Sequence, residues 1–221
     1  MFRPAYTRVD DPARLEAFVA AYPFGILASA GEDGAPEATH IPFVIEAQAG
    51  TGAGVAQAAD QGVLMGHMAR ANPHWRALDG TRPARVIFAG PHGYISPAVY
   101  AEHPSVPTWN YATVHAIGRP RALHDADELW HLLSRQIATY ENGRAAPWRP
   151  ELPEDYRRKM VAGIVGIAMQ VERWEGKFKL SQNRNPAERE RVIAALRAAT
   201  HPGDRELGAF MDAHRDVVFG A

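Results

Sequence analysis

Apolar side chains recur every three or four residues in several segments of the chain, which is the spacing that places them on one face of a helix. The most regular segment is residues 125–143, where Trp130, Leu133, Ile137 and Tyr140 form one stripe. It opens on an aspartate followed three residues later by a glutamate, a capping-box-like start, and it closes on an Asn-Gly pair. Shorter helices are predicted at residues 12–22, through residues 156–160 and from residue 186.

A second set of apolar runs is bounded by glycine and proline and lacks helical spacing, which is typical of strands. The runs cover residues 24–30, 38–47, 62–68, 84–90, 94–96, 108–123 and 164–174. The stretch Gly31–Gly34 between the first two predicts a hairpin turn. Because the runs cluster through short turns and do not alternate regularly with helices, they predict an antiparallel sheet that closes, or nearly closes, into a barrel. The expected fold is mainly β with flanking helices, and a doubly wound parallel fold is disfavoured.

The length of 221 residues, 46% of them hydrophobic, is enough for a sizeable core. We expect one barrel domain with helical flanks over residues 1–200 and a C-terminal tail or short helix over residues 201–221. The Ala- and Gly-rich stretch 46–62 is expected to be a flexible loop between two strands.

Charge and cysteine content exclude several functional classes. Lys and Arg number 24 against 25 Asp and Glu, a formal net charge of −1, so direct nucleic-acid binding is not expected. The absence of cysteine excludes disulfides, thiolate catalysis and cysteine-ligated zinc. No apolar run approaches the roughly 18 residues of a membrane span, and the N-terminal segment has no apolar signal-peptide core. We therefore expect a cytoplasmic protein without membrane contact.

Three familiar motifs find little support. The glycines at 50, 52 and 54 resemble part of a dinucleotide fingerprint, but the helix after them would end at Gly62, and the acid expected about 20 residues later falls near His74 and Trp75. A hairpin loop is favoured there. The ten histidines are scattered singly, so no metal is expected. A serine-hydrolase elbow, Gly-x-Ser-x-Gly, is absent.

Candidate binding chemistry gathers at Arg70, Asn72 and Pro73. Asn72 is a good N-cap and Pro73 a good first helical residue, so a helix starting here would point unpaired N–H groups outward at the positive end of its dipole. Arg70, at the end of a predicted strand, would add a bidentate clamp to a bound phosphate. The alternative is that Asn72 merely caps a helix and that Arg70 is solvated, and this stretch alone favours that alternative.

A second Asn-Pro pair, at residues 185–186, follows a dense cluster of hydrogen-bond donors. The donors are Lys177, Lys179, Gln182, Asn183 and Arg184. A solvated connector with an ordinary cap explains this cluster equally well. Nearby aromatic residues, Trp109, Tyr111 and Phe178, fit either a core or a platform for a flat ligand.

Taken together, long segments between Tyr22 and Arg184 resemble the PaiB-type family of FMN-binding split-barrel proteins, which are described as negative transcriptional regulators. The segments are YPFGILAS, ATHIPFVI, GHMARANPHW, VIFAGPHGYISPAVY, VPTWNYATVHAIGRP and IVGIAMQVERWEGKFKLSQNR. The resemblance covers most of the chain and rests on several segments rather than one short pattern.

The resemblance implies a split β-barrel of the pyridoxamine-phosphate-oxidase-like class, assembled as a homodimer with FMN in the groove between subunits. Carried over by position, the strand along the isoalloxazine ring would supply Thr39, His40, Ile41, Pro42 and Phe43. The segment that holds the FMN phosphate would supply His67, Arg70, Ala71 and Asn72. Trp109 would stand on a further strand near the ring, and the other chain would supply Lys179, Gln182 and Arg184.

The phosphate region offers a single arginine where pyridoxamine phosphate oxidases have a richer Ser-Arg-Lys cluster. We therefore expect a weaker affinity for FMN. The regulatory label also fits poorly with a near-neutral chain that lacks a helix-turn-helix. We therefore expect any regulatory action to be indirect, through the flavin or a protein partner. The alternative is a flavin-dependent oxidoreductase that uses FMN in the same dimer groove.

Overall fold

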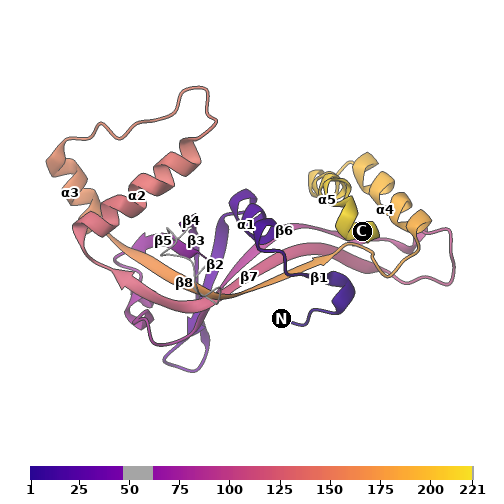
Figure 1. The fold of residues 1–221 in the computed structure, drawn as a ribbon, viewed down its shortest axis with the longest axis horizontal. Coiled ribbons are helices and arrows are strands. Elements are labelled where there is room, and N and C mark those ends of the chain that lie inside the picture. Colours follow the sequence, from indigo (N-terminus) through magenta and orange to yellow (C-terminus); the bar gives the residue numbers. More distant parts are fainter. Residues whose placement is uncertain (47–61, 221) are drawn as a thin grey trace, which may run out of the picture. The chain divides into compact units, whose positions relative to one another are not determined.

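A computed structural model describes residues 1–46 and 62–220 of the chain (Figure 1). The glycines at 50, 52 and 54, and most of the loop predicted at 46–62, lie outside the described residues. The chain divides into two compact units. Unit 1 comprises residues 1–18, 89–114 and 175–221, and unit 2 comprises residues 19–88 and 115–174.

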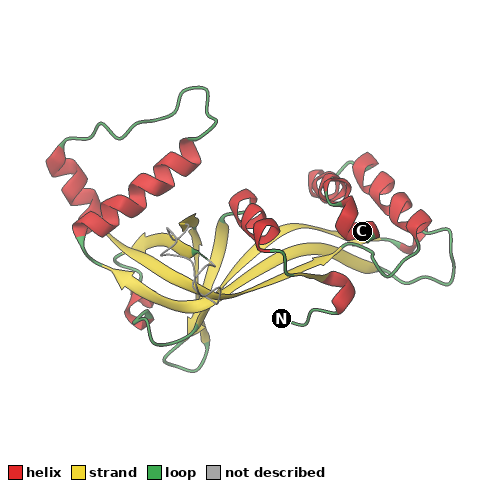
Figure 2. Cartoon of the chain, viewed as in Figure 1, coloured by secondary structure: helices red, strands yellow, loops and turns green. Residues whose placement is uncertain are grey.

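Figure 2 shows the helices and strands of the chain. The strands are β1 (Arg8–Val9), β2 (Phe24–Ala30), β3 (Pro36–Pro42), β4 (Val44–Glu46), β5 (Val63–Ala69), β6 (Ala84–Ile95), β7 (Thr108–Leu123) and β8 (Ile164–Lys179). The helices are α1 (Pro12–Ala21), α2 (Ala126–Glu141), α3 (Glu154–Ala162), α4 (Pro186–Ala198), α5 (Pro202–Ala213) and α6 (Arg215–Phe219). Short 3-10 helices occupy Ala5–Thr7, Pro73–Ala77 and Pro97–Val99.

The sheet has the strand order β3-β2-β6-β7-β8-β5-β4, which leaves β3 and β4 at the two ends of that order. β2 pairs antiparallel with β3, so that Ile26 faces His40, and β5 pairs antiparallel with β8 from Val63 to Ala69. Helices α2 and α3 pack Leu129, Leu132 and Val161 into a buried cluster with residues of β4, β5 and β8. Burying each large aliphatic side chain contributes about 1.5–3 kcal/mol, which fixes the two helices on unit 2.

Unit 1 has its own aromatic core. The rings of Phe18 in α1 and Phe210 in α5 lie with their centroids 5.3 and 5.2 Å from that of Phe178 in β8. β1 pairs with the end of β8, so that Val9 faces Gly176. Phe178 is fully buried and therefore belongs to this core, not to a ligand platform.

The local helix predictions are confirmed at α1, α2, α3 and α4. In α2 the Asp125 carboxylate accepts the amides of Asp127 and Glu128, each at 3.0 Å, as a capping residue should. Residues 202–219, predicted as a tail or short helix, form α5 and α6.

The element boundaries differ from the predicted ones in four strands, β3, β4, β6 and β8. The runs 84–90 and 94–96 are one strand, β6, although Pro91 interrupts them. The pairing of β6 with β2 ends at Phe88, so one edge of β6 beyond that residue has no partner among the described strands, and a proline that lacks an N–H is tolerated there. The run 38–47 divides at Phe43 into β3 and β4, and β8 continues five residues beyond Trp174.

The helix start expected at Asn72 and Pro73 opens a 3-10 helix of five residues. Residues Pro73–Ala77 form a single 3-10 turn, because the Asp79 carboxylate takes the amide and hydroxyl of Thr81 and Gly80 adopts φ 79°, which starts a new turn at once. A turn of this length has no appreciable macrodipole, so the anion site predicted from helix geometry loses that contribution.

Candidate functional site

The predicted ring strand, β3, lies at one end of the strand order. It pairs with β2 on one side, and among the described residues no strand pairs with its other side. An edge strand presents a row of backbone N–H and C=O groups to a ligand. Its side chains alternate, so that Ile41 is buried while His40 is exposed and lies with its ring 6.2 Å from that of Phe24.

A hydrogen-bonded network joins this strand to the turn after β5. The side-chain Nδ2 of Asn72 donates to Thr39 Oγ1 at 3.1 Å, and the same oxygen lies 2.8 Å from His74 Nδ1. His74 Nε2 lies 2.9 Å from Ser29 Oγ in β2. The network therefore connects two strands and the 3-10 turn through one imidazole.

His74 is 3% exposed, and burial lowers its pKa, with a smaller opposing effect from the Glu37 carboxylate. The ring is therefore neutral near pH 7, with one nitrogen donating and the other accepting. Neither His74 nor Ser29 was predicted from the sequence as a site residue. The sequence carries no local signal for these contacts, because His74 reaches β2 and β3 and not β5, the strand that precedes its turn.

Helix α2 holds the other end of β3. The side-chain Nε2 of Gln136 donates to the Pro42 carbonyl at 3.1 Å, and the Tyr140 hydroxyl donates to the Phe43 carbonyl at 2.8 Å. Burial raises the pKa of Tyr140 to about 12, so its hydroxyl stays protonated as the donor. Gln136 Oε1 also lies 2.8 Å from His67 Nδ1. Three predicted site residues, Pro42, Phe43 and His67, are thus tied to two helical residues that sequence reasoning missed.

Arg70 is engaged with the end of α3. Its Nε and Nη2 donate to the carbonyls of Ala162 and Ile164, each at 2.8 Å, and its backbone N–H donates to the Gly163 carbonyl at 2.9 Å. The arginine is therefore not merely solvated. Within residues 1–46 and 62–220, its Nη1 and the amide of the exposed residue Ala71 have no hydrogen-bond partner, so both remain available to an anion.

The Asn72 cap also differs from the expectation. Its carboxamide oxygen accepts the His74 amide at 3.0 Å, so this N–H, which we expected to face outward, is already satisfied. Asn72 consequently offers little free capacity to a phosphate, and its observed contacts position Thr39 and His74.

The remaining predicted residues lie in unit 1. Trp109 is 54% exposed and lies beside the rings of His92 and Tyr94, with centroids at 6.4 and 6.1 Å. Lys179 Nζ donates to the Trp109 carbonyl at 2.7 Å and also to Thr108, and burial, followed by the charge of Lys177, lowers its pKa.

Two further residues of unit 1 were predicted to contact the flavin, Gln182 and Arg184, and both interact with neighbouring residues of the chain. Gln182 Oε1 accepts the Leu180 amide at 2.7 Å. The Arg184 guanidinium stacks 4.1 Å from the centroid of the Tyr100 ring, and its Nη1 donates to Ser105 Oγ at 3.1 Å. A role for either residue at a flavin stays a prediction.

Comparison with known proteins adds a family to this geometry. Residues 1–173 match the family described as "Putative FMN-binding domain". The chain is 33% identical over 214 residues to the protease synthase and sporulation protein PAI 2 of Bacillus subtilis, covering 96% of this chain and 97% of that protein. It is 31% identical to an uncharacterised protein of Emericella nidulans, covering 72% of this chain and 74% of that protein.

Solved structures agree on the fold. The FAD and heme binding protein from Mycobacterium smegmatis has a TM-score of 0.58 at 20% identity, covering 86% of this chain and 80% of its own. The flavocytochrome Anf3 from Azotobacter vinelandii also has a TM-score of 0.58, at 16% identity, covering 80% and 72%. The predicted class, a mainly β split barrel with flanking helices, is confirmed. No helix among the described residues is both long and apolar enough to cross a bilayer.

Proposed function

The chain belongs to the PaiB-type family of FMN-binding split-barrel proteins, and from this membership we propose that it binds FMN in unit 2. The isoalloxazine ring lies along the free edge of β3, and the phosphate lies at the turn formed by residues 70–72. One observation carries the proposal. The Thr39 hydroxyl is hydrogen-bonded to both Asn72 and His74, so the strand for the ring and the turn for the phosphate form one rigid piece.

The chemistry of the donors fits the two ends of FMN. The pyrimidine edge of a flavin carries both acceptors and an N–H donor, which complement the alternating backbone groups of an edge strand. At the other end, Nη1 of Arg70 and the amide of Ala71 supply two donors to a phosphate. Bound FMN would supply hydride and electron-transfer chemistry, while the residues of the chain bind and orient it.

The same proposal includes a homodimer. Exposed aromatic side chains seldom gather on a surface that only meets water, and Trp109 and Tyr94 are about half exposed in contact with each other. We assign this face of unit 1 to the second copy, with Lys179, Gln182 and Arg184 approaching the flavin of the other chain. Light scattering should give twice the 24.2 kDa chain mass. A monomer with bound FMN would exclude the dimeric site.

For the biological role, we propose regulation through the flavin or through a protein partner, without direct contact to DNA. The formal charge of −1 supports this, because nucleic-acid binding relies on a cationic surface. The alternative is a flavin-dependent oxidoreductase. NAD(P)H consumption by FMN-loaded protein separates the two. Turnover well above that of free FMN would favour the enzyme, and turnover equal to it would favour the regulator.

Binding is tested by titrating FMN and riboflavin separately and following the quenching of flavin fluorescence. The phosphate should make FMN bind at least about tenfold more tightly, because a charged hydrogen bond is worth roughly 1.5–3 kcal/mol. Arg70→Gln should weaken FMN about ten- to a hundredfold and leave riboflavin nearly unchanged. Arg76→Gln is the matched control, since Arg76 lies in the 3-10 turn that follows residues 70–72 and stacks 5.5 Å from the Trp75 ring centroid.

A thermal melt of each variant reports folding, because Arg70 also bonds to α3. Equal affinities of the wild-type protein for FMN and riboflavin would refute the phosphate site. Failure of both ligands to bind would refute the proposed function.

A further inference from the structure

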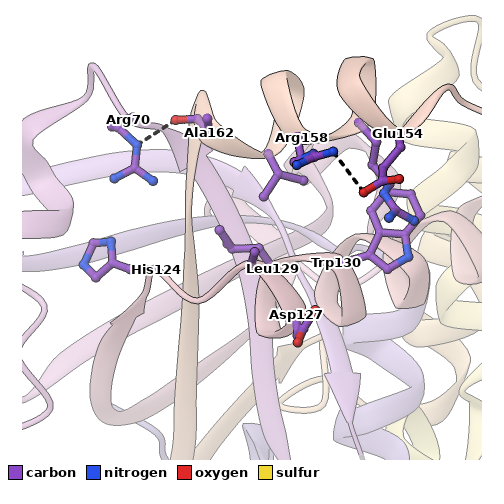
Figure 3. A pocket seen from close by; sticks show the side chains of 11 residues that line it. Arg70, His124, Asp127, Leu129, Trp130, Glu154, Arg158 and Ala162 are labelled. Carbon is purple, nitrogen blue, oxygen red and sulfur yellow. Dashed lines mark hydrogen bonds and ion pairs between the residues drawn. The ribbon is translucent and has the colours of Figure 1, made fainter.

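A cavity of about 580 Å³ lies between α2 and α3 in unit 2 (Figure 3). The FMN proposal uses only Arg70 of its lining. The floor is apolar and is made by Leu129 and Val161, which are 1% and 8% exposed, with Ala126 and Ala162 beside them. Its volume falls within the range of about 300–1,000 Å³ that is usual for small-molecule sites.

The rim of the cavity carries an unbalanced positive charge. The Arg157 guanidinium lies 4.8 Å from the centroid of the Trp130 ring, and no acidic side chain among the described residues pairs with it. Arg158 is neutralised by Glu154 at 3.0 Å. Asp127 lies on the opposite side of the cavity from Arg70 and Arg158 (Figure 3). Because Nη1 of Arg70 is assigned to the FMN phosphate, Arg157 is the cationic group left for a second ligand.

We propose that this cavity binds a small aromatic carboxylate. The ring would rest on the apolar floor beside Trp130, and the carboxylate would take the planar fork of Arg157. Stacking on Trp130 holds that fork in one orientation, so little conformational freedom is lost when a carboxylate binds it in a bidentate manner. An inorganic anion would leave the floor uncovered, and a neutral ring would leave Arg157 without a counter-charge.

The site adjoins the flavin turn through one residue. Arg70 holds the last carbonyls of α3 and also belongs to the turn proposed for the phosphate. A ligand that shifts α3 would therefore alter FMN affinity, and FMN would alter affinity for that ligand by the same factor. This coupling rests on the proposed function, whereas binding of the carboxylate itself does not.

The test uses the full chain and ¹⁹F NMR titration with 4-fluorobenzoate. The neutral 4-fluorobenzamide and inorganic phosphate are the matched ligands, each lacking either the charge or the ring. We expect 4-fluorobenzoate to bind at least tenfold more tightly than either. Arg157→Gln should weaken it at least tenfold, whereas Lys159→Gln, an exposed cation on the same helix outside the cavity lining, should leave binding unchanged.

Several results would overturn the proposal. They are equal binding of the benzamide, no effect of Arg157→Gln, or no binding of 4-fluorobenzoate at all. Direct displacement of 4-fluorobenzoate by FMN, together with loss of FMN affinity in Arg157→Gln, would make the cavity part of the flavin site and would also overturn a second site. If 4-fluorobenzoate binds as expected and FMN does not bind, the proposed function alone fails.

Discussion

Replacing Thr39 by valine tests the network that joins β3 to the turn after β5. Valine keeps the shape of threonine but removes the hydroxyl that meets Asn72 Nδ2 at 3.1 Å and His74 Nδ1 at 2.8 Å. A neutral hydrogen bond contributes about 0.5–1.5 kcal/mol net, so two lost bonds should lower the free energy of unfolding by about 1–3 kcal/mol. For a chain of this size, each kcal/mol corresponds to roughly 2–4 °C in Tm.

The measurement is urea unfolding followed by far-ultraviolet circular dichroism, with m-values compared between variants. Ser29→Ala is the matched control, because it removes one contact of the same imidazole, at 2.9 Å, and should cost about 0.5–1.5 kcal/mol. The double variant should deviate from additivity, since both hydroxyls act on His74. Stability of Thr39→Val within about 0.5 kcal/mol of wild type, or full additivity with Ser29→Ala, would contradict the network.

Three further predictions concern unit 2. Burial holds the pKa of His74 below 6.5. The stability that the neutral imidazole contributes is therefore complete above pH 6.5 and falls as the pH drops from there to the folded-state pKa. His74→Asn should flatten this dependence of the free energy of unfolding on pH. Tyr140→Phe should cost about 0.5–1.5 kcal/mol in urea unfolding, whereas Tyr156→Phe, on an exposed ring, should cost nothing measurable, and equal costs would refute the buried hydrogen bond. Gly118→Ala should lower Tm and reduce the free energy of unfolding by about 1–3 kcal/mol, because the added Cβ would lie 2.1 Å from the Gln170 carbonyl oxygen. An unchanged Tm would mean that β7 and β8 can separate there.

Helix identity was predictable because its signals are local. The Asp125 cap, the stripe along residues 126–140 and the Asn-Pro start at residue 185 act within one turn, and each has the expected element in the structure. The strand cores were predictable for the same reason, since alternation is visible within a run. Their ends were not, because the pairing of Gly176 and Lys177 in β8 with β1 depends on a segment more than 160 residues away.

The sequence by itself determined the family, the mainly β class, the positions of α1 to α4 and the chemical character of the turn around Arg70. Tertiary structure decided what those residues touch. In the folded chain, Arg70 donates to a carbonyl at the end of α3, and the Asn72 side chain accepts the His74 amide. Gln136 and Tyr140 donate to carbonyls at the end of β3. Propensity and capping act between near neighbours, whereas a hydrogen bond from α2 to β3 spans more than 90 residues and exists only after the sheet and helix have packed.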